Sequence, residues 1–388
     1  MASTATPEPV PAPAPAARAP QRVTLVISSL EMGGAERVMT ELANHWVTLG
    51  WTITIIHYSP PSKPPAYPLD PRISVVPLGL HRESHSPVSA VRNNVHRIRA
   101  VRRAIRETRP EVVLSFMANV ITMLATLGLG VPVLVSEHRG PRGELSLPWS
   151  ILREVTYRRA VFVVMLTHSA LAHLSPTLRR RGRVVPNPLP SSFLAREVRV
   201  EPTEGAMAAG PVIMGLGRLG PEKGFDLLIR AFARITGEWP TARLVIWGEG
   251  DERRNLEALV AELGLGGQVS LPGTTPVPED ELLAATVFVL SSRKEGLPMA
   301  LIEAMALGRA VVACDCDHGP RDIITDGVDG LLVPPEDVDA LADAIGGLLR
   351  DDARRASLAR GAMAVRERFT IEAVSSRWEA LFREAVRR

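Results

Sequence analysis

A long stretch without a single charged residue, from Val112 to Val135, limits the fold more than any other feature of the chain. Its length would suit a membrane-spanning helix, but Asn119, Gly128 and Pro132 interrupt it. The stretch divides instead into an apolar strand, VVLSF, a helix, NVITMLATLG, and a second apolar strand, VPVLV. Strands that are apolar throughout are typical of parallel sheets covered by helices on both faces. The sequence therefore favours an α/β fold over a membrane span.

The alternation of apolar strands and helices occurs in two blocks. The first begins with RVTLVISS and the second with VIMGLGRLGPEKGFDLLIRAF, and the residues between them lose any periodicity. A chain of 388 residues is also long for one domain, so we predict two doubly wound domains of about 150 to 200 residues each. The predicted segments are a disordered Pro- and Ala-rich tail (1–20), a first domain (21–190), a linker (191–210), a second domain (211–370) and a C-terminal helix (371–388).

Composition limits the cellular setting. The 45 basic and 42 acidic residues leave a net charge of only +3, so a strongly charged surface requires local clustering. The two cysteines, Cys314 and Cys316, are too few for a disulfide framework, which suits a reducing cytoplasm. The first twenty residues lack the basic start and the apolar segment of a signal peptide. We therefore expect a cytoplasmic protein.

The stretch from Ser291 to Gly308 carries the strongest chemical signal. It reads SSRKEGLPMALIEAMALG and follows an apolar strand, VFVL. We expect Glu295 in a loop at the strand end and Glu303 in the next helix, because Pro298 favours a helix start. The unpaired N–H groups of that helix start can bind phosphate, and carboxylates accept hydrogen bonds from sugar hydroxyls. The pattern predicts a site for a sugar attached to a phosphate, although both glutamates could simply be solvated.

Two glycine-rich turns would approach the same ligand. Gly33 and Gly34 follow the first strand and open a helix, as in the phosphate-binding turns of doubly wound sheets. A glycine pair also suits an ordinary tight turn. In the second block, Arg218 and Lys223 lie between a strand and a helix, where cations and free N–H groups come together. The competing interpretation is an ordinary surface pair of basic residues.

Five short motifs, taken together, resemble the retaining glycosyltransferases of family 4. They are GGAER, SEH, PNP, GRLGPEKG and EGLPMALIE, and the resemblance extends over residues 22–386. It implies the GT-B architecture, in which two Rossmann-like domains face each other across a cleft that holds the active site. It also implies that the last helix crosses back to the first domain.

The resemblance assigns roles to particular residues. Glu295 would orient the donor sugar, and Glu303 would bind the nucleotide ribose. Arg218 and Lys223 would neutralise the leaving diphosphate. His138 would contact the donor sugar from the first domain, unless it is a hydrogen-bonded loop histidine. The implied catalytic set is Glu295, His138, Arg218 and Lys223, and the implied donor-binding set is Gly33, Gly34, Asn187, Arg218, Lys223, Glu295, Gly296, Leu297, Pro298 and Glu303.

The implied reaction is transfer of a hexose or N-acetylhexosamine from a nucleoside diphosphate sugar, with a UDP-sugar favoured, to a hydroxyl group. The expected acceptor is a lipid-linked or surface glycan, carried on a polyprenyl diphosphate. The SEH motif departs from the Ser-Glu-Arg of related enzymes that extend lipid-linked oligosaccharides. This difference bears on which acceptor is used more than on which reaction is catalysed. Three alternatives stay open: a glycosyltransferase for a soluble natural product, a sugar-nucleotide epimerase of the same architecture, and a non-catalytic membrane-associated binding module.

A basic helix is predicted over residues 91–109. Arginines occupy most of its surface, and its apolar residues are expected to share one stripe: Val91, Val95, Ile98, Val101 and Ile105. The helix would either pack with a solvated basic face or contact the inner face of an anionic membrane or the diphosphate of a lipid carrier. Nucleic acid is not an expected partner, because no aromatic residues alternate with the arginines.

No cofactor or metal ion is expected. Asp315, Asp317 and His318 lie close together in the sequence, and Asp-x-Asp binds Mg²⁺ or Mn²⁺ in the other large glycosyltransferase fold. Here the motif follows a strand of a different architecture. The charge of the leaving diphosphate would instead be neutralised by the two cations of the glycine-rich loop.

Overall fold

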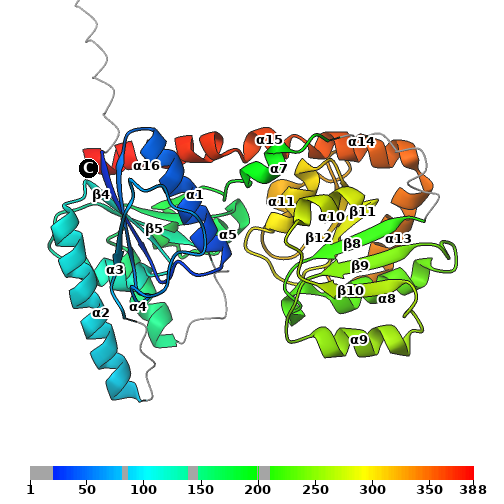
Figure 1. Cartoon of the computed structure of the whole chain (residues 1–388), viewed down its shortest axis with the longest axis horizontal. Helices are drawn as coiled ribbons and strands as arrows, with labels where there is room; N and C mark the ends of the chain where they lie inside the picture. The colour runs from blue at the N-terminus through cyan, green and yellow to red at the C-terminus, as the bar shows by residue number, and fades with distance from the viewer. Residues whose placement is uncertain (1–20, 81–85, 139–146, 199, 201–209) are drawn as a thin grey trace, which may run out of the picture.

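The computed structural model describes residues 21–80, 86–138, 147–198, 200 and 210–388, which form two α/β domains side by side (Figure 1). Each domain is built on one sheet in which all paired strands are parallel. The prediction of two doubly wound domains is thereby confirmed. The predicted tail (1–20) and residues 199 and 201–209 of the predicted linker lie outside the described residues.

The first domain contains a seven-stranded sheet in the order β3-β2-β1-β4-β5-β6-β7. Its strands are β1 (Arg22–Ile27), β2 (Thr52–His57), β3 (Ser74–Pro77), β4 (Val112–Phe116), β5 (Val133–Glu137), β6 (Phe162–Met165) and β7 (Gly182–Val184). Its helices are α1 (Gly34–Thr48), α2 (Pro87–Thr108), α3 (Asn119–Ala125), α4 (Leu147–Tyr157), α5 (His168–Ala172) and α6 (Pro176–Arg179). The strand order reverses between β1 and β4, and ligands of such sheets bind beside that point, beyond the carboxyl ends of the strands.

The second domain contains a six-stranded sheet in the order β10-β9-β8-β11-β12-β13. Its strands are β8 (Val212–Leu216), β9 (Arg243–Trp247), β10 (Val269–Gly273), β11 (Val287–Leu290), β12 (Ala310–Cys314) and β13 (Leu331–Val333). Its helical segments are η1 (Pro221–Lys223), α8 (Phe225–Ile235), α9 (Arg253–Glu262), α10 (Pro278–Ala284), α11 (Met299–Ala306), α12 (Pro320–Ile323), α13 (Val338–Arg350) and α14 (Asp352–Ala362). The order reverses between β8 and β11, so the loops after these two strands meet at one point.

The charge-free stretch forms β4, α3 and β5, as predicted. Strand β4 is buried along its whole length and pairs with β1 on one side and β5 on the other. Its apolar character follows from this central position, because helices cover both faces of the sheet. Among the described helices, none combines the length and the apolar character that crossing a bilayer requires.

The chain passes between the domains twice, and the two passages lie against each other. The first contains a short helix, α7 (Ser191–Ala195), that the sequence pattern does not indicate; its Phe193 is buried in the core of the second domain. The return passage contains α15 (Val365–Arg368). The Leu189 N–H donates to the Phe369 carbonyl at 2.7 Å, which joins the two passages.

The last helix, α16 (Ile371–Arg387), belongs to the core of the first domain. Trp378 and Phe382 are buried there, and the Trp46 indole N–H of α1 donates to the Ser375 hydroxyl at 3.0 Å. In Figure 1 the helix extends from the second domain back over the first. The C-terminal helix thus packs against the seven-stranded sheet that contains the first strand, β1.

The apolar stripe predicted for the basic helix is wrong in its first half. Val101 and Ile105 of α2 are buried, but Val91 is 65% exposed and Val95 is 39% exposed. The predicted stripe fails at the start of α2 because Asn93 is the buried residue there, in place of the two valines. Helix α2 therefore presents its first valines to solvent, beside the arginines.

Candidate active site

The glycine-rich loop after β8 lies directly against the loop after β11. Gly224 adopts a left-handed conformation with φ of +61°, and a Cβ added there would lie 2.2 Å from the Ser291 carbonyl oxygen. A side chain at this position would therefore collide with backbone, which only glycine avoids. The Ser291 hydroxyl in turn donates to the Lys223 carbonyl at 2.9 Å. Close backbone packing thus sets where Lys223 emerges.

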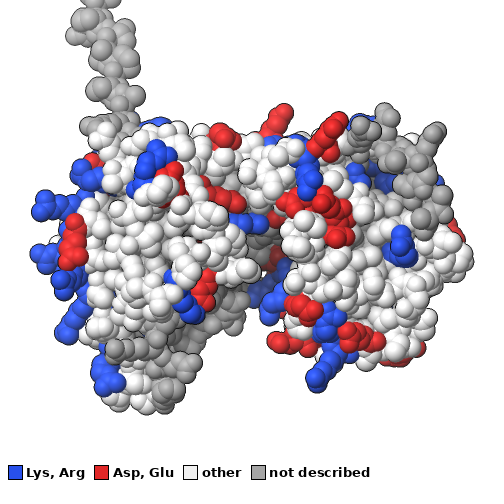
Figure 2. Space-filling view, viewed as in Figure 1, with Lys and Arg blue, Asp and Glu red and all other residues white. Residues whose placement is uncertain are grey.

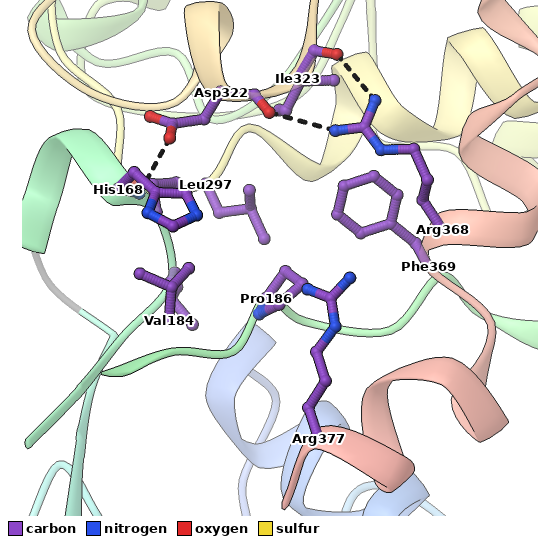
Figure 3. A pocket seen from close by; sticks show the side chains of 11 residues that line it. His168, Val184, Pro186, Leu297, Asp322, Ile323, Arg368, Phe369 and Arg377 are labelled. Carbon is purple, nitrogen blue, oxygen red and sulfur yellow. Dashed lines mark hydrogen bonds between the residues drawn. The ribbon is translucent and has the colours of Figure 1, made fainter. Parts of the chain in front are cut away.

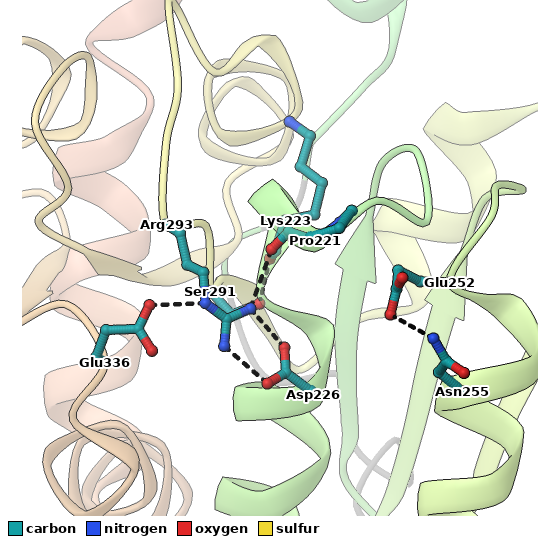
Figure 4. Close-up of polar contacts among 8 residues, drawn as sticks. All are labelled: Pro221, Lys223, Asp226, Glu252, Asn255, Ser291, Arg293 and Glu336. Atoms are coloured by element: carbon teal, nitrogen blue, oxygen red, sulfur yellow. Dashed lines mark hydrogen bonds and ion pairs between the residues drawn. The ribbon is translucent and has the colours of Figure 1, made fainter. Parts of the chain in front are cut away.

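Arg293 joins the same two loops (Figure 4). Its guanidinium binds both carboxylate oxygens of Asp226 at 2.6 and 2.7 Å, and it donates to the Pro221 carbonyl at 3.0 Å. Its Nε donates to Glu336 at 2.7 Å. A bidentate arginine–carboxylate pair fixes orientation as well as distance. Arg293 therefore ties the glycine-rich loop to the loop that carries Glu295.

Lys223 and Glu295, both predicted site residues, form an ion pair. The Lys223 ammonium lies 2.7 Å from Oε1 of Glu295, and the Ser292 hydroxyl donates to the same oxygen at 2.6 Å. The Glu295 side chain is only 7% exposed, whereas that of Lys223 is 22% exposed. A nearly buried carboxylate beside a cation that still reaches solvent is suited to a ligand carrying both hydroxyl groups and negative charge.

Arg218, predicted beside Lys223, has a different partner. Its guanidinium pairs with Glu222 at 2.7 Å, and its side chain is 64% exposed. An exposed pair of this kind contributes little to stability, so Arg218 can leave Glu222 at small cost. The structure thus brings Lys223 to Glu295 and leaves Arg218 on the rim of the same loop.

The segment from Gly296 to Pro298 leads into α11. Pro298 caps the helix without a side-chain hydrogen bond, and the first N–H groups of any helix have no partner within it. Leu297 lines a cavity of about 170 Å³ between the domains, together with His168 and Arg377 (Figure 3). The cavity lies beside the interdomain passages, because Pro186, Arg368 and Phe369 also line it.

Glu303, one turn into α11, contacts the first domain. It is 7% exposed, and burial raises its pKa. Its Oε1 accepts a hydrogen bond from the Arg37 guanidinium of α1 at 3.4 Å. Glu41 lies on α1, one turn after Arg37, and burial raises the pKa of Glu41 to about 7. The motif GGAER contains Arg37, but the residue pattern gave no signal that it faces the second domain.

The glycine pair of the first domain lies under a carboxylate. Gly33 is the N-cap of α1 in extended backbone, and a Cβ added there would lie 2.2 Å from the Glu36 carboxylate. Glu36 also accepts a hydrogen bond from the Ser29 hydroxyl at 3.1 Å. The Glu36 carboxylate therefore lies against the start of the helix, and a diphosphate that approached Gly33 and Gly34 would have to displace it.

His138 follows β5 and packs against the Phe116 ring, with the ring centroids 4.2 Å apart. Its Nε2 is 3.2 Å from the Ser136 hydroxyl. Burial lowers the pKa of His138 to about 3, so the imidazole is neutral at physiological pH. Its carbonyl oxygen lies 3.8 Å from the place a Cβ on Gly296 would occupy. His138 therefore meets the Glu295 loop from the opposite domain.

Replacing His138 by glutamine is expected to reduce the acid sensitivity of folding. An unfolded histidine titrates near pH 6.5, so between pH 6.5 and 3 the unfolded chain holds a proton that the folded site does not. The contribution to stability is complete above pH 6.5 and is lost as the pH falls toward 3. We expect the wild type to lose about 1–2 kcal/mol more than the variant between pH 7 and pH 5. Urea unfolding at both pH values measures this difference, and equal losses would contradict it.

Asn187, the remaining predicted donor-site residue, is buried in the segment after β7. Asp322 of α12 bonds the first domain: its carboxylate accepts hydrogen bonds from the N–H groups of His168 and Ser169 at 2.8 and 3.2 Å. Arg368 donates to the carbonyls of Asp322 and Ile323, as Figure 3 shows. The Asp322 bonds join the two domains beside the passages.

The Asp315 to His318 segment is occupied by protein contacts. Arg321 pairs with both oxygens of the Asp315 carboxylate, and the buried His318 ring stacks edge-on against His173 of the first domain with centroids 4.4 Å apart. Within the described part of the chain, no three His, Cys, Asp or Glu side chains are grouped in a way that could hold a metal ion.

The comparisons with known proteins match both halves of this cleft. The family described as "Glycosyltransferase Family 4" matches residues 32–193, and the family described as "Glycosyl transferases group 1" matches residues 204–364. The chain belongs to the family 4 glycosyltransferases. Its fold is GT-B: a sucrose-phosphate synthase of Thermosynechococcus elongatus superposes with a TM-score of 0.77 at 21% identity, over 94% of this chain and 98% of that one.

This family 4 glycosyltransferase covers a small part of one relative and almost the whole of another. An exopolysaccharide phosphotransferase of Streptomyces coelicolor is 32% identical over 292 residues, which is 74% of this chain but 30% of that protein. An α-1,4-N-acetyl-D-galactosaminyltransferase of Campylobacter jejuni is 26% identical over 366 residues, 94% of this chain and 98% of that protein. The name of the Campylobacter protein specifies a diphosphoundecaprenol-linked acceptor.

Proposed function

We propose that the protein transfers a hexose or N-acetylhexosamine from a nucleoside diphosphate sugar to a hydroxyl group and retains the anomeric configuration. The observation that carries the proposal is the Lys223–Glu295 ion pair at 2.7 Å, beside the start of α11 and facing His138. This arrangement puts a cation where a diphosphate would leave and a carboxylate where sugar hydroxyls would bind. A sugar diphosphate bound between Lys223 and Glu295 would contact the cation through its diphosphate and the carboxylate through its hydroxyl groups.

In the proposed reaction, negative charge grows on the diphosphate as the glycosidic bond breaks. Lys223, Arg218 and the amides at the start of α11, with Gly296, Leu297 and Pro298 shaping that turn, stabilise this charge. The acceptor hydroxyl attacks from the same face and passes its proton to a diphosphate oxygen. Glu295 orients the sugar, and the neutral His138 hydrogen-bonds it from the first domain.

The nucleoside would lie deeper in the second domain. Glu303 accepts a hydrogen bond from the ribose, and Gly33 and Gly34 approach the diphosphate once Glu36 moves aside. Asn187 closes the site from the interdomain passage. UDP-sugars are the first donors to test.

The acceptor proposed first is a glycan on a polyprenyl diphosphate, at the cytoplasmic face of the membrane. The Campylobacter relative supports this choice, because its name specifies an acceptor of that class and it matches this chain over nearly its full length. A soluble natural-product acceptor is the second candidate. An epimerase would form product without any acceptor, and a binding module would bind nucleotide without turnover, so both differ from the proposal in simple assays.

Helix α2 offers a surface for such a membrane contact. The exposed residues along one helical face are apolar toward the N-terminal end and basic toward the C-terminal end: Val88, Val91, Val95, Arg99 and Arg106. Figure 2 shows basic side chains gathered at the edge of the first domain that α2 forms. Valines can enter the headgroup region while arginines bind anionic lipids.

Replacing Val91 and Val95 by aspartate is expected to weaken binding to phosphatidylglycerol vesicles at least tenfold. The change removes apolar area from the membrane contact and adds repulsion from the anionic lipid, which acts at roughly 1 kcal/mol per charge near the surface. Both residues are exposed, so folding should be unaffected. Vesicle sedimentation measures the binding, with phosphatidylcholine vesicles as the uncharged control. Unchanged sedimentation of the variant would remove α2 from the proposal.

The experiment that tests the proposed function starts with calorimetric titration of UDP, GDP and ADP. One nucleotide is expected to bind, and Glu303→Ala should weaken it by more than about 1 kcal/mol, the loss expected for a charge-assisted hydrogen bond. Sugar donors of that nucleotide are then assayed with acceptors, and the anomeric proton of the product is examined by NMR. Absence of nucleotide binding, or an inverted product, would refute the proposal.

A further inference from the structure

One arginine reaches across the cleft to a carboxylate of the other domain. Arg37 leaves α1 of the first domain, and its side chain is 27% exposed; that of Glu303 in the second domain is 10% exposed. The two are separated by 266 residues in sequence and by 3.4 Å in space. Nη2 of Arg37 makes this contact, and it ends on Oε1 of Glu303.

Two carboxylates approach Arg37, and a third acts on Glu303. Glu41 lies on the same helix with an oxygen 3.8 Å from Nε, and Glu279 at the start of α10 raises the pKa of Glu303 through its charge. An approach of 3.8 Å is too long for a hydrogen bond, and Nε of Arg37 is buried without a hydrogen-bond partner among the described residues. Arg37 is therefore the cation in contact with both Glu41 and Glu303.

The electrostatic balance at Glu303 depends on that cation. Burial and the neighbouring Glu279 favour the protonated carboxyl group, and Arg37 favours the carboxylate. A protonated carboxyl would lose one of its acceptor oxygens and would meet ribose hydroxyls as a poorer acceptor. Arg37, a residue of the opposite domain, is thus the contact that favours the carboxylate form of Glu303.

We propose that Arg37 is a positioning residue for the donor nucleotide: from the first domain it holds Glu303 as a carboxylate, oriented by its Oε1 contact, so that Oε2 is left for the ribose. This rests on the proposed function, in which Glu303 binds the ribose. Because Arg37 reaches Glu303 only when the two domains are close, nucleotide affinity and domain closure are coupled through this contact.

The test is the pH dependence of UDP affinity, measured by calorimetry between pH 5 and pH 8.5. In the wild type, affinity falls in acid as Glu303 is protonated. In Arg37→Gln the midpoint of this fall is expected to move up by about 1 pH unit, since the nearby opposite charge is gone. Arg37→Lys keeps a cation and should lie closer to the wild type. Titration of the UDP phosphate is the same in every protein and cancels in the comparison.

Two further variants make the result decisive. Glu41→Lys adds a cation beside Glu303, so its midpoint is expected to move down by about 1 pH unit, opposite to Arg37→Gln. Arg158→Gln, an exposed arginine paired with Glu154, is the matched control and should leave the midpoint unchanged. If Arg37→Gln does not fold, Glu41→Lys decides the question alone.

The outcomes separate this inference from the proposed function. Wild-type protein that binds none of UDP, GDP and ADP at any pH refutes the proposed function. Wild-type protein that binds UDP, with acid midpoints that coincide in Arg37→Gln, Glu41→Lys and the wild type, overturns only the role of Arg37. Midpoints that move in opposite directions support it, because a purely structural defect would not shift them with the sign of the charge.

Discussion

Replacing Lys223 by methionine is expected to lower kcat/KM for sugar transfer by about 10²–10³, the usual effect of removing one group that stabilises charge in a transition state. Lys223 is the cation nearest Glu295, at 2.7 Å, and it remains partly open to solvent. Arg218 is mostly exposed and paired with Glu222, so it compensates only in part. Methionine keeps the unbranched side chain up to the position of Cε, so the loss mainly reports the missing charge.

The same change leaves Glu295 almost buried without its cation, which costs stability as well. Thermal unfolding of the Lys223→Met and Lys223→Met/Glu295→Gln variants separates the two effects, since the second substitution removes the stranded charge. Lys63→Met is the matched control: Lys63 pairs with Glu31 at 3.0 Å, but both side chains are exposed. Activity of Lys223→Met within threefold of the control would contradict the proposed site.

Replacing Trp378 by alanine is expected to lower the free energy of unfolding of the first domain by about 3–5 kcal/mol, the cost of a large cavity in a core. Trp378 is 2% exposed on α16. Its ring stacks near Phe382 and near Phe116, with centroid distances of 6.0 and 6.1 Å. Because Phe116 packs against His138, the cavity would also loosen the first-domain side of the cleft.

Denaturant unfolding followed by the remaining tryptophans measures this loss. Ser376→Ala, on the exposed side of the same helix, should change stability by less than about 0.5 kcal/mol. Both substitutions raise the helical propensity of α16, so a loss of similar size in both variants would contradict a specific contribution from the packing of Trp378. Lowered kcat/KM in folded Trp378→Ala would further indicate that His138 depends on the support of Phe116.

The sequence by itself determined the elements and the loops of the site. The apolar runs specified β4 and β5 without a membrane span, because residues buried on both faces of a sheet leave no polar alternation. The glycine-rich turn and the segment before Pro298 specified two strand-to-helix loops, and parallel sheets bring such loops to one edge. Local patterns of this kind depend only on neighbouring residues, so they can be read along the chain.

Only the tertiary structure decided which side chains meet. It paired Lys223 with Glu295 while Arg218 went to Glu222, placed Arg37 against Glu303, and turned Val91 and Val95 outward. The physical reason is that these outcomes depend on contacts between residues far apart in sequence and on how two domains pack. Charges on a loop and valines on a helix are compatible with several partners, and the partner is chosen by the folded surroundings, which leave no periodic trace in the sequence.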